Sequence, residues 1–210
     1  MKIAIVHDFL LRYGGAEALV QAWAEKYPEA KIYTLLYDEQ KMGKFFPKER
    51  VISSGLQKYY DRFKMYSLLL PFMSVAIETF DLNEYDIVLS SSGAFSHAVL
   101  THTGQRHVSY IHSPMRWAWD WHFNFTQERG MSKWKEFIFR CILSKIRVWD
   151  YQTAGRADLL LAASTTIQAR IRKYWDRPSQ LLHPFADVKR FMPIDKPSQD
   201  YYLVVAQLVP

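Results

Sequence analysis

The sequence contains almost no cysteine and lacks the common nucleotide-binding loops. A single cysteine, Cys141, among 210 residues excludes an internal disulfide framework. With one cysteine and scattered histidines there is no zinc-ligand spacing, so we predict no metal site. The one glycine pair near the start, Gly14-Gly15, fits neither the dinucleotide-binding pattern G-x-G-x-x-G nor the P-loop pattern. Dehydrogenases and P-loop NTPases are therefore disfavoured.

Long hydrophobic runs are missing as well. No segment approaches the about 20 uncharged apolar residues that a membrane-spanning helix needs. The chain opens on a strand-like run instead of a basic, cleavable hydrophobic signal, so we expect a cytoplasmic protein. The 49% apolar content is enough for a substantial core, in one large domain or in one domain plus a fragment.

Positive charge and aromatic residues are in excess. The net charge is +6 and aromatic residues make up 16% of the chain, which together indicate an anionic or lipidic partner. The basic residues are not gathered in a recognition helix or a nucleic-acid module. We therefore predict no nucleic-acid partner.

The opening stretch "VHDFLLRYGGAE" has the pattern of a strand, a loop and a helix. The apolar run Ile3 to Val6 predicts a short interior strand, and apolar residues recur at helical spacing from Ala16 onward. Gly14 and Gly15 stand just before that helix, where free backbone N–H groups make an anion site. Glycines there allow close approach of a phosphate and a positive φ. A tight turn without a ligand is the alternative.

Strand-like runs alternate with helical stretches along most of the chain. This alternation predicts an α/β fold, with a Rossmann-like, mostly parallel sheet flanked by helices. Ligands of such sheets bind at the loops that follow the strands. After the first, the runs are Lys31 to Leu36, Asp86 to Ser90, His107 to Ile111, Asp158 to Ala163 and Gln180 to His183.

The character of the sequence changes near its end. Residues 1–184 are expected to form the Rossmann-like domain, and the proline-rich, charged residues 185–200 to form a linker. Residues 201–210, "YYLVVAQLVP", are typical of an interior strand, which we expect to be the first strand of a second domain. A last strand that docks on the first sheet is the alternative.

Basic and aromatic residues are concentrated in two segments, residues 55–80 and 132–149. A basic amphipathic helix rich in aromatics can lie in the surface of an anionic membrane, whereas a helix that merely covers the sheet has the same apolar stripe. The first segment is the better candidate. Its predicted membrane face consists of Lys58, Tyr59, Arg62, Phe63 and Lys64.

Three stretches in the same order resemble the family 4 glycosyltransferases, especially bacterial mannosyltransferase-like enzymes of polysaccharide assembly. They are "KIAIVHDFLLRYGGAE", "VSYIHSPMRWAWD" and "DLLLAASTTIQARIRKYWDRPSQLLHPFADVKRF" with the closing "YYLVVAQLVP". The resemblance covers essentially the whole chain. It implies the N-terminal, acceptor-binding half of a two-domain GT-B enzyme, whose donor-binding half would lie beyond Pro210. The family retains anomeric configuration and typically needs no metal, so protein dipoles and cations must stabilise the leaving group.

The resemblance also implies roles for single residues. Gly14 and Gly15 match the glycine loop that faces the donor diphosphate, and His112 matches a cleft histidine that contacts the transferred sugar. We expect His112 to be the catalytic residue, able to use either protonation state near neutral pH. A histidine bonded to a loop carbonyl is the alternative.

The expected acceptor-binding residues follow two strands: Asp8, Arg116, Trp117, Trp119 and Asp120. Aromatic rings stack on sugars and arginine binds phosphate. The alternatives are that Asp8 orders a loop and that the other four serve packing and ion pairing. Three positions depart from the family: Ala163 replaces an asparagine, His183 a proline, and Gln207 an arginine near the diphosphate.

The function expected from these features is sugar transfer from a nucleotide sugar, with GDP-mannose as one candidate donor, and no cofactor. The acceptor is a glycan or a polyprenyl-diphosphate-linked glycan at the inner membrane leaflet. Without the donor half the chain is expected to be inactive. Two alternatives remain, a non-catalytic peripheral membrane module that binds an anionic glycolipid and an unrelated Rossmann-like nucleotide enzyme.

Overall fold

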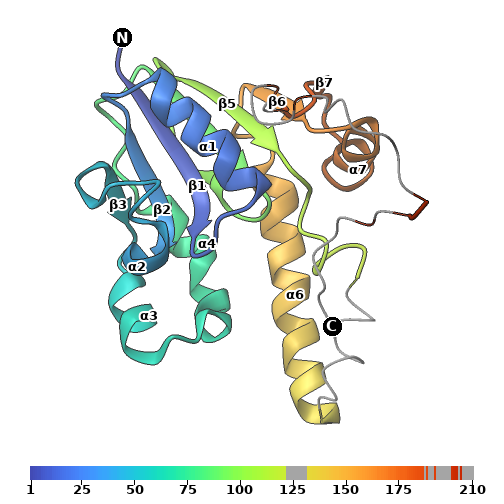
Figure 1. Ribbon diagram of the computed structural model, residues 1–210. Helices are drawn as coiled ribbons and strands as arrows, with labels where there is room; N and C mark the ends of the chain where they lie inside the picture. Colours follow the sequence, from blue (N-terminus) through green and yellow to red (C-terminus); the bar gives the residue numbers. More distant parts are fainter. Residues whose placement is uncertain (122–131, 187, 189–191, 193–199, 203, 205–210) are drawn as a thin grey trace.

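The computed structural model describes residues 1–121, 132–186, 188, 192, 200–202 and 204. Its centre is a seven-stranded sheet in the order β3-β2-β1-β4-β5-β6-β7. All six neighbouring pairs are parallel, so every strand ends at the same edge. This confirms the predicted α/β, Rossmann-like architecture (Figure 1).

The strands are β1 (Ile3–Leu10), β2 (Lys31–Tyr37), β3 (Val51–Ser53), β4 (Ile87–Ser92), β5 (Arg106–Ile111), β6 (Leu159–Ala162) and β7 (Gln180–Leu181). The α-helices are α1 (Gly15–Lys26), α2 (Glu39–Met42), α3 (Gln57–Phe63), α4 (Leu70–Glu78), α6 (Lys133–Thr153) and α7 (Thr165–Trp175). Short 3-10 turns are η1 (Lys48–Arg50), η2 (Tyr66–Leu69) and η3 (Ser96–Ala98). All six predicted strands are present, and the short edge strand β3 was not predicted.

The first strand is longer than its apolar run. The sequence predicted an end at Val6, but β1 continues through His7 and Asp8 to Leu10. Both polar residues are buried, with exposed fractions of 3% and 5%. They are tolerated in a central strand because each has internal hydrogen-bond partners, described below.

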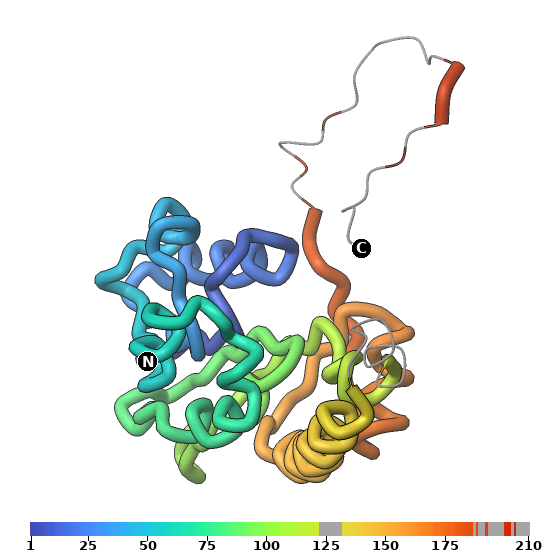
Figure 2. The backbone as a smooth tube through the Cα atoms, turned by 90° about the horizontal axis from the view of Figure 1, so that it is seen from below, coloured from blue at the N-terminus to red at the C-terminus, as the bar shows by residue number. Residues whose placement is uncertain are grey.

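Helices cover the two faces of the sheet. On one face Val20 and Ala24 of α1 pack in a cluster with Ile5 and Ile32. On the other, Met73 and Ile77 of α4 and Ile146 of α6 pack in a cluster with Ala4, Val6 and Val88. Figure 2, which looks from below, shows α1 (blue) apart from the yellow coil of α6. The core therefore lies in two layers around the sheet.

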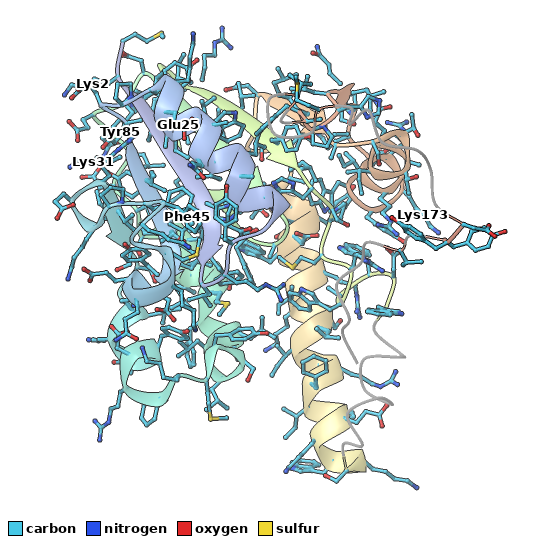
Figure 3. The ribbon with its side chains drawn as sticks, viewed as in Figure 1. Lys2, Glu25, Lys31, Phe45, Tyr85 and Lys173 are labelled. Atoms are coloured by element: carbon cyan, nitrogen blue, oxygen red, sulfur yellow. The ribbon has the colours of Figure 1, made fainter. Side chains whose placement is uncertain are left out.

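The two ends of the strands differ in character. Lys2, Lys31 and Tyr85 mark the edge where β1, β2 and β4 begin (Figure 3). At the opposite edge, α3 and the long α6 extend beyond the sheet (Figure 1). The loops of this second edge hold the candidate site.

The predicted linker and following strand lie mostly outside the described residues, and Gln207 lies outside them entirely. Among the described residues, no helix is both long and apolar enough to cross a membrane.

Candidate functional site

The site lies where the chain reverses its direction of travel across the sheet. From β1 the chain moves outward to β2, whereas β4 lies on the other side of β1 and leads to β5. The loops after β1 and β4 therefore diverge, and parallel α/β sheets bind ligands in the crevice that this creates. A cavity of about 670 Å³ opens at this edge between α1 and the segments after β5, β6 and β7, lined by residues that include Gly15, Leu19, His112, Ala163 and Pro184.

The two glycines form the start of α1 but do not use a left-handed backbone. Gly14 is the N-cap, with an extended φ of −157°, and neither Gly14 nor Gly15 has a positive φ. The sequence-based expectation of positive φ is therefore wrong. What distinguishes Gly15 is space, because a Cβ there would meet no atom within 4 Å. The position borders the cavity, so a ligand can approach the backbone closely.

Glu17 lies inside the first turn of the same helix. Burial acts to raise the pKa of this carboxyl, but the hydrogen bond and charge of His7, with backbone donors at Glu17 and Gly14, lower it overall. Glu17 is thus ionised at neutral pH and satisfies part of the helix N-terminus. A Cβ at Gly14 would come within 3.0 Å of its Oε2 atom, so Gly14 leaves room for this carboxylate.

His112 follows β5 and reaches back toward the end of β4. Its Nε2 atom lies 2.8 Å from the hydroxyl oxygen of Ser91. Burial, and then the charge of His7, lower the pKa of His112 to about 4. The expectation that both protonation states are accessible near neutral pH is therefore wrong, because the ring stays neutral.

A chain of hydrogen bonds continues from Ser91 into the sheet. The Nδ1 atom of His7 lies 3.2 Å from the Ser91 hydroxyl and 3.0 Å from the Ser91 main-chain oxygen. On its other side, His7 Nε2 lies 3.3 Å from Glu17 Oε1. Four side chains from β1, α1, β4 and the end of β5 are thus connected, and only His112 and Glu17 belong to loops or helix ends.

The carboxylate of Asp8 holds the loop after β4. It accepts hydrogen bonds from the backbone N–H groups of Gly93, Ala94, Phe95 and Ser96, at 2.6–2.8 Å. Each oxygen accepts two of them. This is the role of a carboxylate that orders a loop, one of the two roles that the sequence left open. An acceptor contact for Asp8 stays a prediction.

None of the four candidate residues after His112 lines the cavity, and two of them contact α6 or α7. Trp119 donates from Nε1 to Asp150 at 2.8 Å and stacks on Tyr174. Asp120 pairs with Arg170 at 3.1 Å and accepts from Tyr174. Trp117 is half-buried and packs near Phe95, while Arg116 is exposed and lies over the ring of Trp121. The packing and ion-pairing alternative is thus realised in part, and ligand contact by these four stays a prediction.

Asp150, which anchors this packing, is fully buried. Burial raises the pKa of its carboxyl, while its neighbour His97 and the N–H groups of Trp119 and Trp175 act in the opposite direction. It lies 3.4 Å from His97, whose own pKa burial lowers. We assign the pair to structure, because neither residue lines the cavity.

Within the described ranges, no group of three or more His, Cys, Asp or Glu residues is placed to hold a metal ion. Sequence reasoning missed His7, Glu17 and Ser91. Glu17 had a readable signal, because it stands three residues after the N-cap glycine, where a glutamate reaches back to the cap. Ser91 had none, since its place opposite His7 depends on the pairing of β1 with β4.

Comparison with known proteins supports the fold. No protein-family model and no curated protein sequence matches the chain. Among solved structures it is similar to Anabaena Alr3699/HepE, whose crystal structure is in complex with UDP. The identity is 15% and the TM-score 0.51, and the match covers 90% of this chain but 45% of that one. The likeness shows a shared fold, and this chain spans less than half the length of that protein.

Proposed function

We propose that the chain is the acceptor-binding half of a retaining glycosyltransferase. The donor is a nucleotide sugar, with GDP-mannose as one candidate, and the acceptor is a glycan or a polyprenyl-diphosphate-linked glycan of polysaccharide assembly. One observation carries the proposal. In a fold shared with a UDP complex, the cavity at the carboxyl edge of the sheet brings an open helix-start glycine and a neutral histidine together.

The chemistry of these two groups fits a sugar diphosphate. The helix N-terminus offers phosphate oxygens its positive dipole and those of its N–H groups that the Glu17 carboxylate does not bind, while the histidine can exchange a hydrogen bond with a sugar hydroxyl. In this proposal the donor-binding half contributes most nucleotide contacts. The test is NMR titration of the chain with UDP, GDP, their sugars and NAD. We expect shifts at Gly15 and His112 with sugar nucleotides, and tight NAD binding would contradict the proposal.

Gly15→Ala is expected to weaken nucleotide binding about tenfold, a loss of about 1.4 kcal/mol. The added methyl group enters open space at the cavity, where the phosphate would approach. Folding should not suffer, because the backbone allows alanine, and the free energy of unfolding should stay equal or rise by up to about 1 kcal/mol. Titration calorimetry and urea denaturation measure the two quantities.

Gly55→Ala is the matched control, since a Cβ there also meets nothing within 4 Å and Gly55 is remote from the cavity. It should leave the affinity unchanged. If Gly15→Ala and the unaltered chain bind nucleotide with equal affinity, the phosphate does not bind at this helix N-terminus.

The proposed acceptor side includes the membrane face named above. Its aromatic members are exposed, Tyr59 by 47% and Phe63 by 54%. An apolar cavity of about 610 Å³ adjoins it, lined in part by Leu56, Leu69 and Phe72. Exposed apolar surface with basic neighbours favours contact with anionic lipid, which supports a lipid-linked acceptor.

Charge reversal of Lys58, Arg62 and Lys64 to glutamate is expected to abolish binding to vesicles that contain anionic phosphatidylglycerol. In the unaltered chain this binding should weaken as salt rises, because each basic residue near the surface contributes about 1 kcal/mol. The control reverses Lys2, Lys26 and Lys31, which lie at the opposite edge of the sheet. Unchanged vesicle binding by the first variant would show that α3 is not the membrane face.

The same exposed surface supports a second candidate function, a non-catalytic module that holds an anionic glycolipid. This candidate expects vesicle binding without any nucleotide effect at Gly15 or His112. The NMR titration separates the two candidate functions, because only the glycosyltransferase proposal requires the chain to bind a nucleotide as well as a lipid.

A further inference from the structure

The chain of hydrogen bonds behind His112 has a direction that its partners determine. Glu17, at one end, is an ionised carboxylate and can only accept. The main-chain oxygen of Ser91 can likewise only accept. The imidazole of His7 lies between these two acceptors, at 3.3 Å from Glu17 Oε1 and 3.0 Å from the Ser91 oxygen. Its Nδ1 nitrogen therefore carries hydrogen and donates to the Ser91 main-chain oxygen.

This protonation of His7 decides what the hydroxyl group of Ser91 can do. The Nδ1–H of His7 donates toward Ser91, so the hydroxyl hydrogen cannot point at that nitrogen. The one other hydrogen-bond partner of this hydroxyl in the described part of the chain is His112 Nε2, at 2.8 Å. Ser91 therefore donates to His112, and Nε2 of His112 accepts.

A neutral imidazole that accepts at Nε2 carries its hydrogen at Nδ1. In the described ranges, no hydrogen-bond partner is recorded for Nδ1 of His112, and the residue lines the cavity beside Gly15. Burial, and then the charge of His7, lower the pKa of the His112 ring and so disfavour a second proton on it. His112 thus offers a hydrogen-bond donor to a ligand, and it is not a base.

We propose that His7 and Ser91 are positioning residues that hold His112 as the neutral Nδ1–H tautomer, so that it donates a hydrogen bond into the cavity. The chemical use of that donor, to a sugar hydroxyl or a phosphate oxygen, rests on the proposed function. The tautomer itself does not, because the residues that determine it all lie in the described chain.

The test is NMR of the chain labelled with ¹⁵N-histidine, at pH 7 and without nucleotide. Two-bond ¹H–¹⁵N correlations distinguish the Nδ1–H, Nε2–H and doubly protonated rings, and His7→Gln and His112→Ala assign the signals. We expect a hydrogen on Nδ1 of both His7 and His112. An Nε2–H His112 in the unaltered chain overturns the proposal, whatever the variants do.

Glu17→Gln separates the two acceptors that His7 meets, because residue 17 does not touch His112. The new amide can donate to Nε2 of His7, while the Ser91 main-chain oxygen still only accepts and keeps the hydrogen on Nδ1. The His112 ring should therefore remain Nδ1–H. Ser91→Ala removes the connection and should leave a mixture of both tautomers. A switch of His112 to Nε2–H in Glu17→Gln, or a single unchanged tautomer in a folded Ser91→Ala chain, contradicts the proposal.

Ser67→Ala is the matched control for Ser91→Ala. It removes the same hydroxyl group from the exposed turn η2, outside the lining of the cavity. The His112 tautomer should not change. Addition of UDP to the same samples reports separately on the proposed function, so a chain with the expected tautomer and no nucleotide response would leave this inference standing and exclude the proposed nucleotide contacts at Gly15 and His112.

Discussion

Asp8→Asn is expected to lower the free energy of unfolding by about 3 kcal/mol or more. The substitution leaves two buried N–H groups without an acceptor, and each such loss costs about 1–3 kcal/mol. Each carboxylate oxygen of Asp8 accepts from two backbone N–H groups of residues 93–96. The asparagine amide keeps one acceptor oxygen for two of these N–H groups. Its NH2 group faces the other two N–H groups, which are left without an acceptor. Water cannot replace the lost acceptor, because Asp8 is 95% buried, with an exposed fraction of 5%.

Urea denaturation measures this loss. Asp61→Asn is the matched control, because that carboxylate is exposed and pairs with Lys64 at the surface. Its effect should stay within about 0.5 kcal/mol. If Asp8→Asn were equally mild, the loop after β4 would be held by other contacts, and an acceptor-binding role for Asp8 would gain support.

His112→Ala is expected to lower kcat for sugar transfer by about a hundredfold or more in the two-domain enzyme proposed above. The variant deletes the donor that we propose His112 directs at the sugar, and loss of a single well-placed donor costs about 10²–10³ in rate. The free energy of unfolding should fall by only about 1 kcal/mol, because one hydrogen bond to Ser91 is lost.

Initial rates of nucleotide release from the donor sugar, with KM determined separately, measure this effect. A fall in kcat with little change in KM indicates a contact made mainly in the transition state. His102→Ala serves as the control, since His102 is an exposed histidine in the loop before β5. Full activity of His112→Ala would exclude a catalytic role for the ring.

The layout of the sheet could be predicted from the sequence because its interior strands are apolar runs separated by helical periodicity. β3 was missed because Val51–Ser53 is three residues long and only partly buried. The end of β1 was missed for a different reason. His7 and Asp8 are polar, and a strand can bury them only if residues about 85 positions away in the sequence form hydrogen bonds with them.

The candidate site was predicted less completely than the fold. His112 and Gly15 could be found because loops at the carboxyl edge of a parallel sheet are the expected place for ligands. The neutral state of His112 could not be found, since it depends on burial and on the charge of His7. The aromatic residues near position 119 have the composition of a sugar site, yet Trp119 bonds to Asp150 on α6. That partner is 31 residues away and is visible only in the fold.

The hydrogen bonds of Asp8 also constrain how the chain folds. The loop of residues 93–96 receives its acceptor from β1, across a sequence separation of 85–88 residues. The loop therefore cannot reach its final shape before β1 and β4 have paired, and closing so long a segment is an entropic cost met before the contacts form. The cavity itself is lined by residues from Tyr13 to Ala186, so a nascent chain has no complete cavity until it contains every strand of the sheet.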